Sequence, residues 1–196
     1  LTNPEHLAYI VNETVKQLSG VDILVNNAAW CRFPAIWEVT AKHMQLAFQM
    51  NVHTPNMLSQ LAYPYLKEKG EGWILNISSA TADTPPAAPW NFEERYLQYN
   101  RDNHPTVYGT SKSALDRLTV GWALEMSGSG IAVNALAPVG AVASEGAMAV
   151  GGWDANDHLE PVEAMAEAAL QLCHRPAAEC SGHVVRSIPL LKQLGV

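Results

Sequence analysis

Short apolar runs alternate with longer segments of helical periodicity along the whole chain. The runs cover residues 21–25, 72–79, 130–138 and 182–186. Between them, apolar residues recur at steps of three and four, which predicts helices over 4–18, 40–69, 107–127 and 161–173. This alternation is typical of βαβ units, which place parallel strands in one sheet with helices on both faces. The sequence therefore predicts an α/β fold whose strands, including 21–25, are buried on both faces.

Composition and charge exclude several classes of protein. A chain of 196 residues with 48% hydrophobic and 16% charged residues fits one domain with a sizeable core. The net charge of −7 argues against binding nucleic acid through phosphate contacts. No apolar stretch approaches the length of a membrane span, and the three cysteines lack CxxC spacing. We therefore expect a cytoplasmic protein with reduced thiols, no metal site, and no nucleic-acid or membrane partner.

The residues best suited to catalysis are Tyr108 and Lys112, four positions apart in the predicted helix 107–127. Side chains at this spacing lie on the same helix face. At roughly 5 Å and an effective dielectric of about 20, a cation stabilises a phenolate by about 3 kcal/mol, which predicts a lowered tyrosine pKa. A phenol tuned in this way is a general acid–base catalyst. The same pair also arises by chance on solvated helix faces, so it does not identify a site alone.

Polar residues stand where the predicted strands end. Asn26 and Asn27 follow the first apolar run, Ser79 ends the second, and Pro138 ends the third. In open parallel sheets the functional site lies at the carboxyl ends of the strands. These residues are therefore expected to gather at one edge of the sheet.

Together these segments resemble the short-chain dehydrogenase/reductase family. The similarity rests on residues 21–29, Asn51, 77–79, 108–112 and 134–138, and it spans essentially the whole chain. It implies a Rossmann-like, doubly wound parallel sheet, a cofactor that is NAD or NADP, and interconversion of a secondary alcohol and a ketone by hydride transfer. It does not identify the substrate.

The resemblance assigns roles to four catalytic residues. Tyr108 is the general acid or base, and Lys112 lowers the tyrosine pKa and binds the nicotinamide ribose. Ser79 donates a hydrogen bond to the substrate oxygen, and Asn51 helps to hold a water that relays protons to Lys112. Two alternatives stay open: Ser79 as a turn residue at a strand end, and Asn51 as a helix-kink residue beside Pro55.

The resemblance also implies cofactor contacts. Beside the tyrosine–lysine pair, it assigns them to Asn26, Ala28, Pro138, Gly140 and Ser144. Asn26 braces the sheet where the chain passes the adenine ribose, and Pro138 abuts the nicotinamide. Ser144 binds the carboxamide or is an exposed loop hydroxyl.

One family feature has no counterpart in the sequence. The Gly-rich turn whose backbone amides hold the cofactor pyrophosphate does not occur in the 196 residues. We therefore interpret 1–196 as a single partial Rossmann domain that lacks its first strands, with 21–25 exposed as a sheet edge. Such a chain is expected to bind dinucleotide poorly, and its choice between NAD and NADP is not readable. The alternative function is a catalytically silent homologue that cannot bind dinucleotide.

Two loops are expected to border the substrate. Residues 80–107 form a long insertion, rich in aromatic residues, that is either a lid over an apolar substrate or a surface decoration packed on itself. Its aromatic residues are Trp90, Phe92, Tyr96 and Tyr99. The second loop spans 140–160 and carries Met148, Trp153 and His158. By resemblance, helices 40–69 and 107–127 pair across subunits, which predicts a homodimer or homotetramer for the full-length form.

Overall fold

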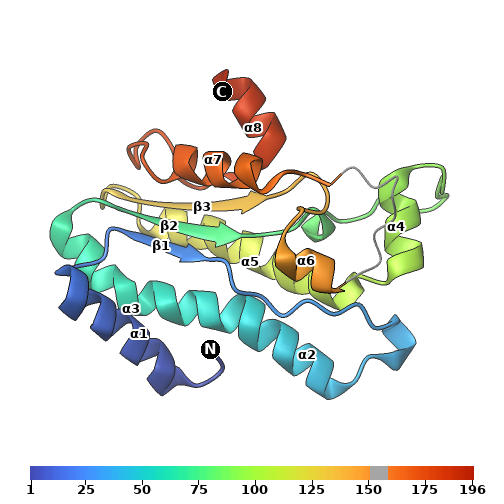
Figure 1. The fold of residues 1–196 in the computed structure, drawn as a ribbon, viewed down its shortest axis with the longest axis horizontal. Helices are drawn as coiled ribbons and strands as arrows, with labels where there is room; N and C mark the ends of the chain where they lie inside the picture. The colour runs from blue at the N-terminus through green and yellow to red at the C-terminus, as the bar shows by residue number, and fades with distance from the viewer. Residues whose placement is uncertain (151–158) are drawn as a thin grey trace.

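The computed structural model describes residues 1–150 and 159–196, and its centre is a parallel sheet (Figure 1). The strands are β1 (Ile23–Asn26), β2 (Gly72–Ile77), β3 (Ile131–Ala137) and β4 (Val184–Arg186), and they lie in sequence order. Each strand pairs in parallel with the next, and the register sets Asn26 beside Asn76 and Ala137 beside Arg186. The carboxyl ends of all four strands therefore meet at one edge, as the sequence predicted.

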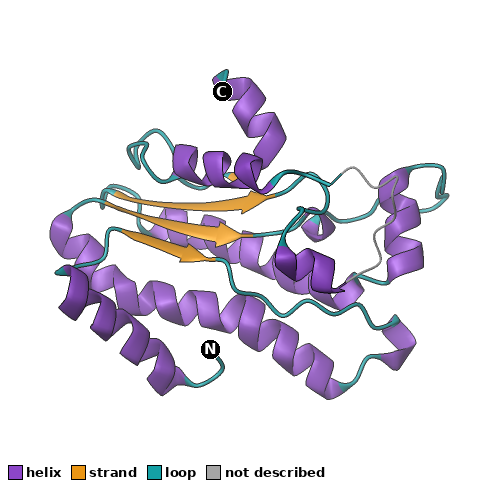
Figure 2. Cartoon of the chain, viewed as in Figure 1, coloured by secondary structure: helices purple, strands orange, loops and turns teal. Residues whose placement is uncertain are grey.

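Helices cover both faces of this sheet, which confirms the α/β prediction (Figure 2). One face packs against α3 (Thr54–Lys69) and α5 (Thr106–Glu125), in a core that includes Leu66, Ile74 and Val133. The other face packs against α7 (Val162–Leu172) and α8 (Ser187–Leu194). Helix α1 (Pro4–Leu18) lies outside α3 and buries Leu7 and Val11. Apolar burial on two faces is the main force that holds such a sheet.

The first strand departs from the prediction of burial on both faces. β1 forms one edge of the sheet, and its Ile23 and Val25 side chains are 46% and 47% exposed. Leu24, between them, points the other way and packs on the core. The prediction of an exposed apolar edge at 21–25 is therefore confirmed, while the prediction of two buried faces is wrong for this strand.

The long helix predicted over 40–69 is two α-helices joined by a π-helical turn. Helix α2 (Ala41–Phe48) begins with a capping box between Thr40 and His43, and the turn η2 (Gln49–His53) leads into α3. The sequence has prolines at 55 and 64 in this stretch, and the break lies directly before Pro55, in the first turn of α3, whereas Pro64 lies inside α3 without ending it. The π turn separates the two α-helices, and such turns are frequent at functional sites.

Among the described residues, five short elements outside the predicted helices and strands were not expected. They are η1 (Ile36–Glu38), η3 (Ala80–Ala82), α4 (Arg95–Asn103), α6 (Glu145–Val150) and the C-terminal helix α8. Helix α4 lies in the predicted loop 80–107, and its one buried residue, Leu97, gives no readable apolar stripe. Trp153 and His158, expected to border the substrate, lie outside the described residues.

Replacing Ile23 with lysine should reduce self-association with little loss of stability. The side chain is half exposed on an edge strand, where a charge opposes strand-to-strand pairing with another molecule. Ile10→Lys is the matched control, because Ile10 is similarly exposed, at 41%, but lies on helix α1. Sedimentation velocity across a concentration series measures the effect. Equal behaviour of the two variants would show that the strand edge does not drive association.

Candidate active site

Helix α5 brings Tyr108 and Lys112 to the carboxyl end of β2. Tyr108 is the third residue of the helix, and Lys112 follows one turn later. The Lys112 ammonium is buried, lies 5.6 Å from the centroid of the Tyr108 ring, and donates a hydrogen bond to the carbonyl oxygen of Ile77 at 2.6 Å. The spacing seen in the sequence therefore places both groups on one helix face, turned toward the end of the central strand.

Burial controls the proton affinity of Tyr108. Burial raises the pKa of its phenol above the ordinary value, and Cys31 and Tyr99 act in the same direction. A hydrogen bond with the Ser79 side chain opposes this rise. The sequence predicted a lowered pKa for Tyr108, and this is wrong because loss of solvation disfavours the phenolate more than the nearby groups favour it. The phenol is therefore protonated at neutral pH.

The pKa of Lys112 moves in the opposite direction. Burial lowers it from 10.5 to about 8, while the Asp116 carboxylate one turn further along α5 partly restores it. Asp116 itself has a pKa raised by burial, with the Ser78 side chain, Arg186 and Lys112 opposing the rise. The face of α5 thus carries a phenol, an ammonium and a carboxyl in successive turns.

Ser79 begins the short turn η3, which connects β2 to the insertion. Its hydroxyl oxygen accepts a hydrogen bond from the Thr81 amide at 3.2 Å and lies 2.9 Å from the Thr81 hydroxyl. The turn packs directly on α5, where a Cβ atom at Gly109 would lie 2.4 Å from the carbonyl oxygen of Thr81. Ser79 is therefore both a turn residue, one of the two alternatives from the sequence, and a neighbour of Tyr108.

Asn51 lies in the π turn η2 and is fully buried. Its side-chain oxygen accepts from the Trp30 amide at 2.8 Å, and its amide group donates to the Trp30 carbonyl and the Ser111 hydroxyl, each at 2.9 Å. It therefore ties the loop after β1 to the residue preceding Lys112. A proton-relay role for Asn51 stays a prediction.

Asn26 starts a chain of buried hydrogen bonds across the sheet. Its side chain donates to Asn76 at 2.8 Å, and Asn76 donates to Thr119 of α5 at 2.8 Å. The side-chain oxygen of Asn26 has no partner among the described residues. Asn26 and the exposed Ala28 also border a hollow of about 280 Å³ beside β1 and α3.

The loop after β3 is held by Glu160, a residue that sequence reasoning missed. The Glu160 carboxylate is buried, accepts a hydrogen bond from the Val139 amide at 2.9 Å, and also accepts one from the Ser187 hydroxyl. Pro138 and Gly140 flank the Val139 anchor, while Ser144 caps α6 by accepting from the Ala147 amide at 3.2 Å. Cofactor contacts of these three residues stay predictions. No sequence pattern connected Glu160 to this loop.

The aromatic residues of the insertion 80–107 differ in their contacts. Trp90 and Phe92 are exposed and pair at 6.2 Å, and the Arg101 guanidinium lies 4.4 Å from the Phe92 ring. Tyr99, in contrast, acts electrostatically on Tyr108. The ring of Phe33, from the loop after β1, lies 5.6 Å from the Tyr108 ring, a neighbour that the sequence did not reveal.

Two further properties concern the part of the chain that the structure describes. Residues 1–150 and 159–196 contain no group of three or more His, Cys, Asp or Glu side chains arranged to bind a metal ion. Within the same residues, every helix is too short or too polar to cross a lipid bilayer.

Sequence comparison relates the chain to known dehydrogenases. The profile of the family described as short chain dehydrogenase matches residues 1–90. Hydroxysteroid dehydrogenase-like protein 2 of Danio rerio is 30% identical over 186 residues, which are 95% of this chain and 41% of that protein. The chain therefore spans less than half the length of that curated relative.

Solved structures share the fold. Acetoin dehydrogenase from Salmonella typhimurium superimposes with a TM-score of 0.72 at 25% identity, over 92% of this chain and 68% of that one. A 7 alpha-hydroxysteroid dehydrogenase complexed with NADH and 7-oxo glycochenodeoxycholic acid gives a TM-score of 0.75 at 26% identity, over 94% and 69%. Both likenesses extend over nearly all of this chain.

Gly109→Ala should destabilise the protein although alanine is the better helix former. The added methyl group would meet the Thr81 carbonyl and push η3 away from α5, at a cost of about 1–3 kcal/mol. Gly121→Ala in the same helix is the control, because its methyl group meets only the flexible end of Arg117 at 3.1 Å. Urea unfolding should show the control unchanged or stabilised by up to about 1 kcal/mol. Equal stability of both variants would contradict the close approach.

Lys112→Met should stabilise the protein at neutral pH. A pKa lowered from 10.5 to about 8 corresponds to about 3 kcal/mol of lost stability, of which the hydrogen bond to Ile77 offsets about 1 kcal/mol. Between pH 8 and 10.5 the unfolded chain holds a proton that the folded chain has released, so wild-type stability from this group rises with pH. The advantage of the variant over wild type, measured by urea unfolding, should therefore be largest below pH 8 and shrink up to pH 10.5. A constant difference would contradict the lowered pKa.

Proposed function

Because this chain belongs to the short-chain dehydrogenase/reductase family, we propose that it carries the catalytic residues of an oxidoreductase that interconverts a secondary alcohol and a ketone with NAD or NADP. The observation that carries the proposal is the convergence of Tyr108, Lys112 and Ser79 at the end of β2. The phenol of Tyr108, the ammonium of Lys112 and the hydroxyl of Ser79 lie close together there, with the Phe33 ring beside Tyr108. That is the set of groups that carbonyl reduction requires.

The state of Tyr108 fits the direction of reduction. Its raised pKa keeps the phenol protonated, so that it donates its proton to the carbonyl oxygen as the alcohol forms. The Ser79 hydroxyl donates a hydrogen bond to the same oxygen and fixes its position. The ammonium of Lys112 then stabilises the phenolate that remains on Tyr108. In the reverse direction the phenolate removes the alcohol proton.

The residues present fit the nicotinamide end of a dinucleotide. When bound, that group donates or accepts the hydride. An ammonium has three donors, and Lys112 uses one on Ile77, so that two can reach a ribose. The side-chain oxygen of Asn26 is buried without a partner among the described residues, so it can accept a further hydrogen bond. For the pyrophosphate, the 196 residues contain no Gly-rich turn, and affinity of this chain alone is therefore expected to be weak.

The surroundings of Tyr108 favour an apolar substrate. The Phe33 ring lies on one side, and Tyr99 of the insertion approaches from α4. The half-buried Cys31 thiol is a third neighbour, and burial raises its pKa so that it stays neutral. We propose that α4 acts as a lid through Tyr99, while the exposed Trp90 and Phe92 pack on the insertion itself. The proposal thus assigns the two alternatives from the sequence to different residues of one segment.

A catalytically silent homologue is the second candidate function. The missing Gly-rich turn favours it, because phosphate groups are commonly held by such a turn at a helix N-terminus. The retained side chains around Tyr108 favour the enzyme. The two candidates differ in one measurable property, which is saturable binding of NADH or NADPH.

Tyr108→Phe should abolish dinucleotide-dependent reduction of apolar ketones while dinucleotide binding remains measurable. The phenyl ring retains the packing against Phe33 but has no proton to donate. Absorbance of NADH and of NADPH is followed with a panel of ketones, and binding is followed by quenching of tryptophan fluorescence. Tyr9→Phe is the matched control, since Tyr9 is 65% exposed on α1.

Three outcomes decide between the candidates. Turnover that Tyr108→Phe lowers by at least about 100-fold, with the control unaffected, supports the enzyme. Wild-type turnover in the Tyr108 variant would overturn the catalytic assignment. Failure of both dinucleotides to saturate the chain at millimolar concentration would favour the silent homologue.

A further inference from the structure

The end of β2 is held at three successive residues, Ile77, Ser78 and Ser79. Lys112 donates to the carbonyl oxygen of Ile77 at 2.6 Å, and the Ser78 amide donates to the carbonyl oxygen of Leu136 in β3 at 2.8 Å. The third contact is a hydrogen bond at 3.1 Å from the Arg186 guanidinium to the carbonyl oxygen of Ser79. The first contact comes from Lys112 of the proposed catalytic pair, and the second is part of the β2–β3 sheet pairing. The third comes from Arg186, which lies outside the proposed catalytic set.

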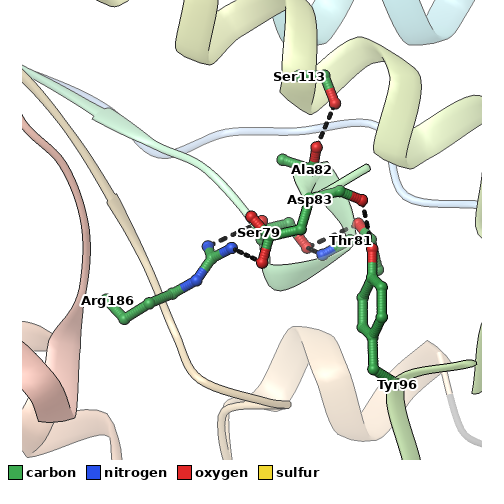
Figure 3. Close-up of polar contacts among 7 residues, drawn as sticks. All are labelled: Ser79, Thr81, Ala82, Asp83, Tyr96, Ser113 and Arg186. Atoms are coloured by element: carbon green, nitrogen blue, oxygen red, sulfur yellow. Dashed lines mark hydrogen bonds and ion pairs between the residues drawn. The ribbon is translucent and has the colours of Figure 1, made fainter. Parts of the chain in front are cut away.

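Arg186 spans both ends of the η3 turn (Figure 3). One terminal nitrogen of its guanidinium contacts the Ser79 carbonyl, and the other lies 2.6 Å from the Asp83 carboxylate. The Arg186 side chain is 21% exposed and that of Asp83 is 64% exposed, so solvent screens the ion pair between them. A planar guanidinium with fixed donors can hold two acceptors in one geometry, which a lysine cannot.

Two other helices hold the remainder of the turn. The Ser113 hydroxyl of α5 donates to the Ala82 carbonyl, and the Tyr96 hydroxyl of α4 donates to the Asp83 carbonyl (Figure 3). The lid helix and the turn that carries Ser79 are therefore attached at the same residue, Asp83. Arg186 reaches this residue from β4, on the far side of β3 from β2.

We propose that Arg186 is a positioning residue that fixes the Ser79 hydroxyl against Tyr108. Ser79 follows the last residues of β2 in extended conformation, and its hydroxyl direction depends on the orientation of its own peptide group. Without the hydrogen bond from Arg186, the Ser79 carbonyl oxygen keeps only the hydrogen bond from the Ala82 amide at 3.1 Å, which lies within the turn itself and does not tie the turn to the sheet. A displacement of about 1 Å at a catalytic group can cost 100-fold in rate. The consequence for rate rests on the proposed function, whereas the consequence for geometry does not.

The geometry is tested by NMR on protein labelled with carbon-13 at the tyrosine Cζ position. The Tyr108 signal is assigned with Tyr108→Phe, and its chemical shift reports hydrogen bonding at the hydroxyl. Ser79→Ala defines the shift that follows loss of the Ser79 partner. Arg186→Gln should move the Tyr108 signal in the same direction by at least half as much. The double variant should move it no further than Ser79→Ala alone, because both changes remove one interaction.

Arg175→Gln is the matched control. Arg175 is partly buried, like Arg186, and its guanidinium contacts Gln171 at 3.5 Å, away from η3. This control should leave the Tyr108 signal at the wild-type position. Arg186→Lys retains the charge but only one contact, and should give a smaller displacement than Arg186→Gln. If Arg186→Gln does not fold, the lysine variant is judged against the same wild-type position.

A Tyr108 signal unmoved by Arg186→Gln, together with a lower unfolding temperature, would overturn the proposal, because Arg186 would then only stabilise the fold. The kinetic arm is separate. Where turnover is measurable, Arg186→Gln should lower kcat at least about 10-fold with KM changed less than about twofold. A displaced signal in a protein without turnover upholds the positioning role and contradicts only the proposed function.

Discussion

The close approach of the η3 turn to helix α5 is the contact on which the site depends. Residue 109 must lack a Cβ atom for the Thr81 carbonyl to lie against the helix one residue after Tyr108. That approach brings Ser79, at the start of the turn, toward the phenol. The parallel register of β2 and β3 fixes where the turn begins, and glycine allows it to fold back onto α5. The strand register and the absence of a side chain at residue 109 are thus both needed to bring Ser79 toward Tyr108.

The buried ammonium of Lys112 shows the conflict between stability and function. A cation taken out of water lowers the free energy of unfolding, and its contact with a backbone carbonyl offsets only part of this. Burial raises the pKa of the neighbouring Tyr108 and thereby keeps its phenol neutral. Together these shifts leave a proton on the phenol and a positive charge beside it, which suits proton donation followed by stabilisation of the phenolate. A core optimised for stability alone would hold apolar side chains at both positions.

Much of the fold and the centre of the site could be predicted from the sequence, for identifiable reasons. Buried strands leave continuous apolar runs, and Tyr108, Lys112 and Ser79 lie near the ends of such elements. Helix α4 was missed because only Leu97 is buried, so no apolar periodicity marks it. The pKa of Tyr108 was predicted in the wrong direction, because a single charge pair in a sequence says nothing about solvation. Contacts such as that of Phe33 with Tyr108 join distant segments and leave no local pattern.

The junction between β4 and α8 connects the two loops that border the site. Arg186, the last residue of β4, pairs in register with Ala137 and extends its guanidinium to the turn after β2. Ser187, the next residue, donates to Glu160, whose carboxylate holds the Val139 amide in the loop after β3. Adjacent residues of the chain thus contact both loops, the turn that carries Ser79 and, through Glu160, the segment that carries Val139. Any shift of β4 along its register would displace both loops together, so the shortest strand of the sheet constrains the relative placement of the two halves of the site.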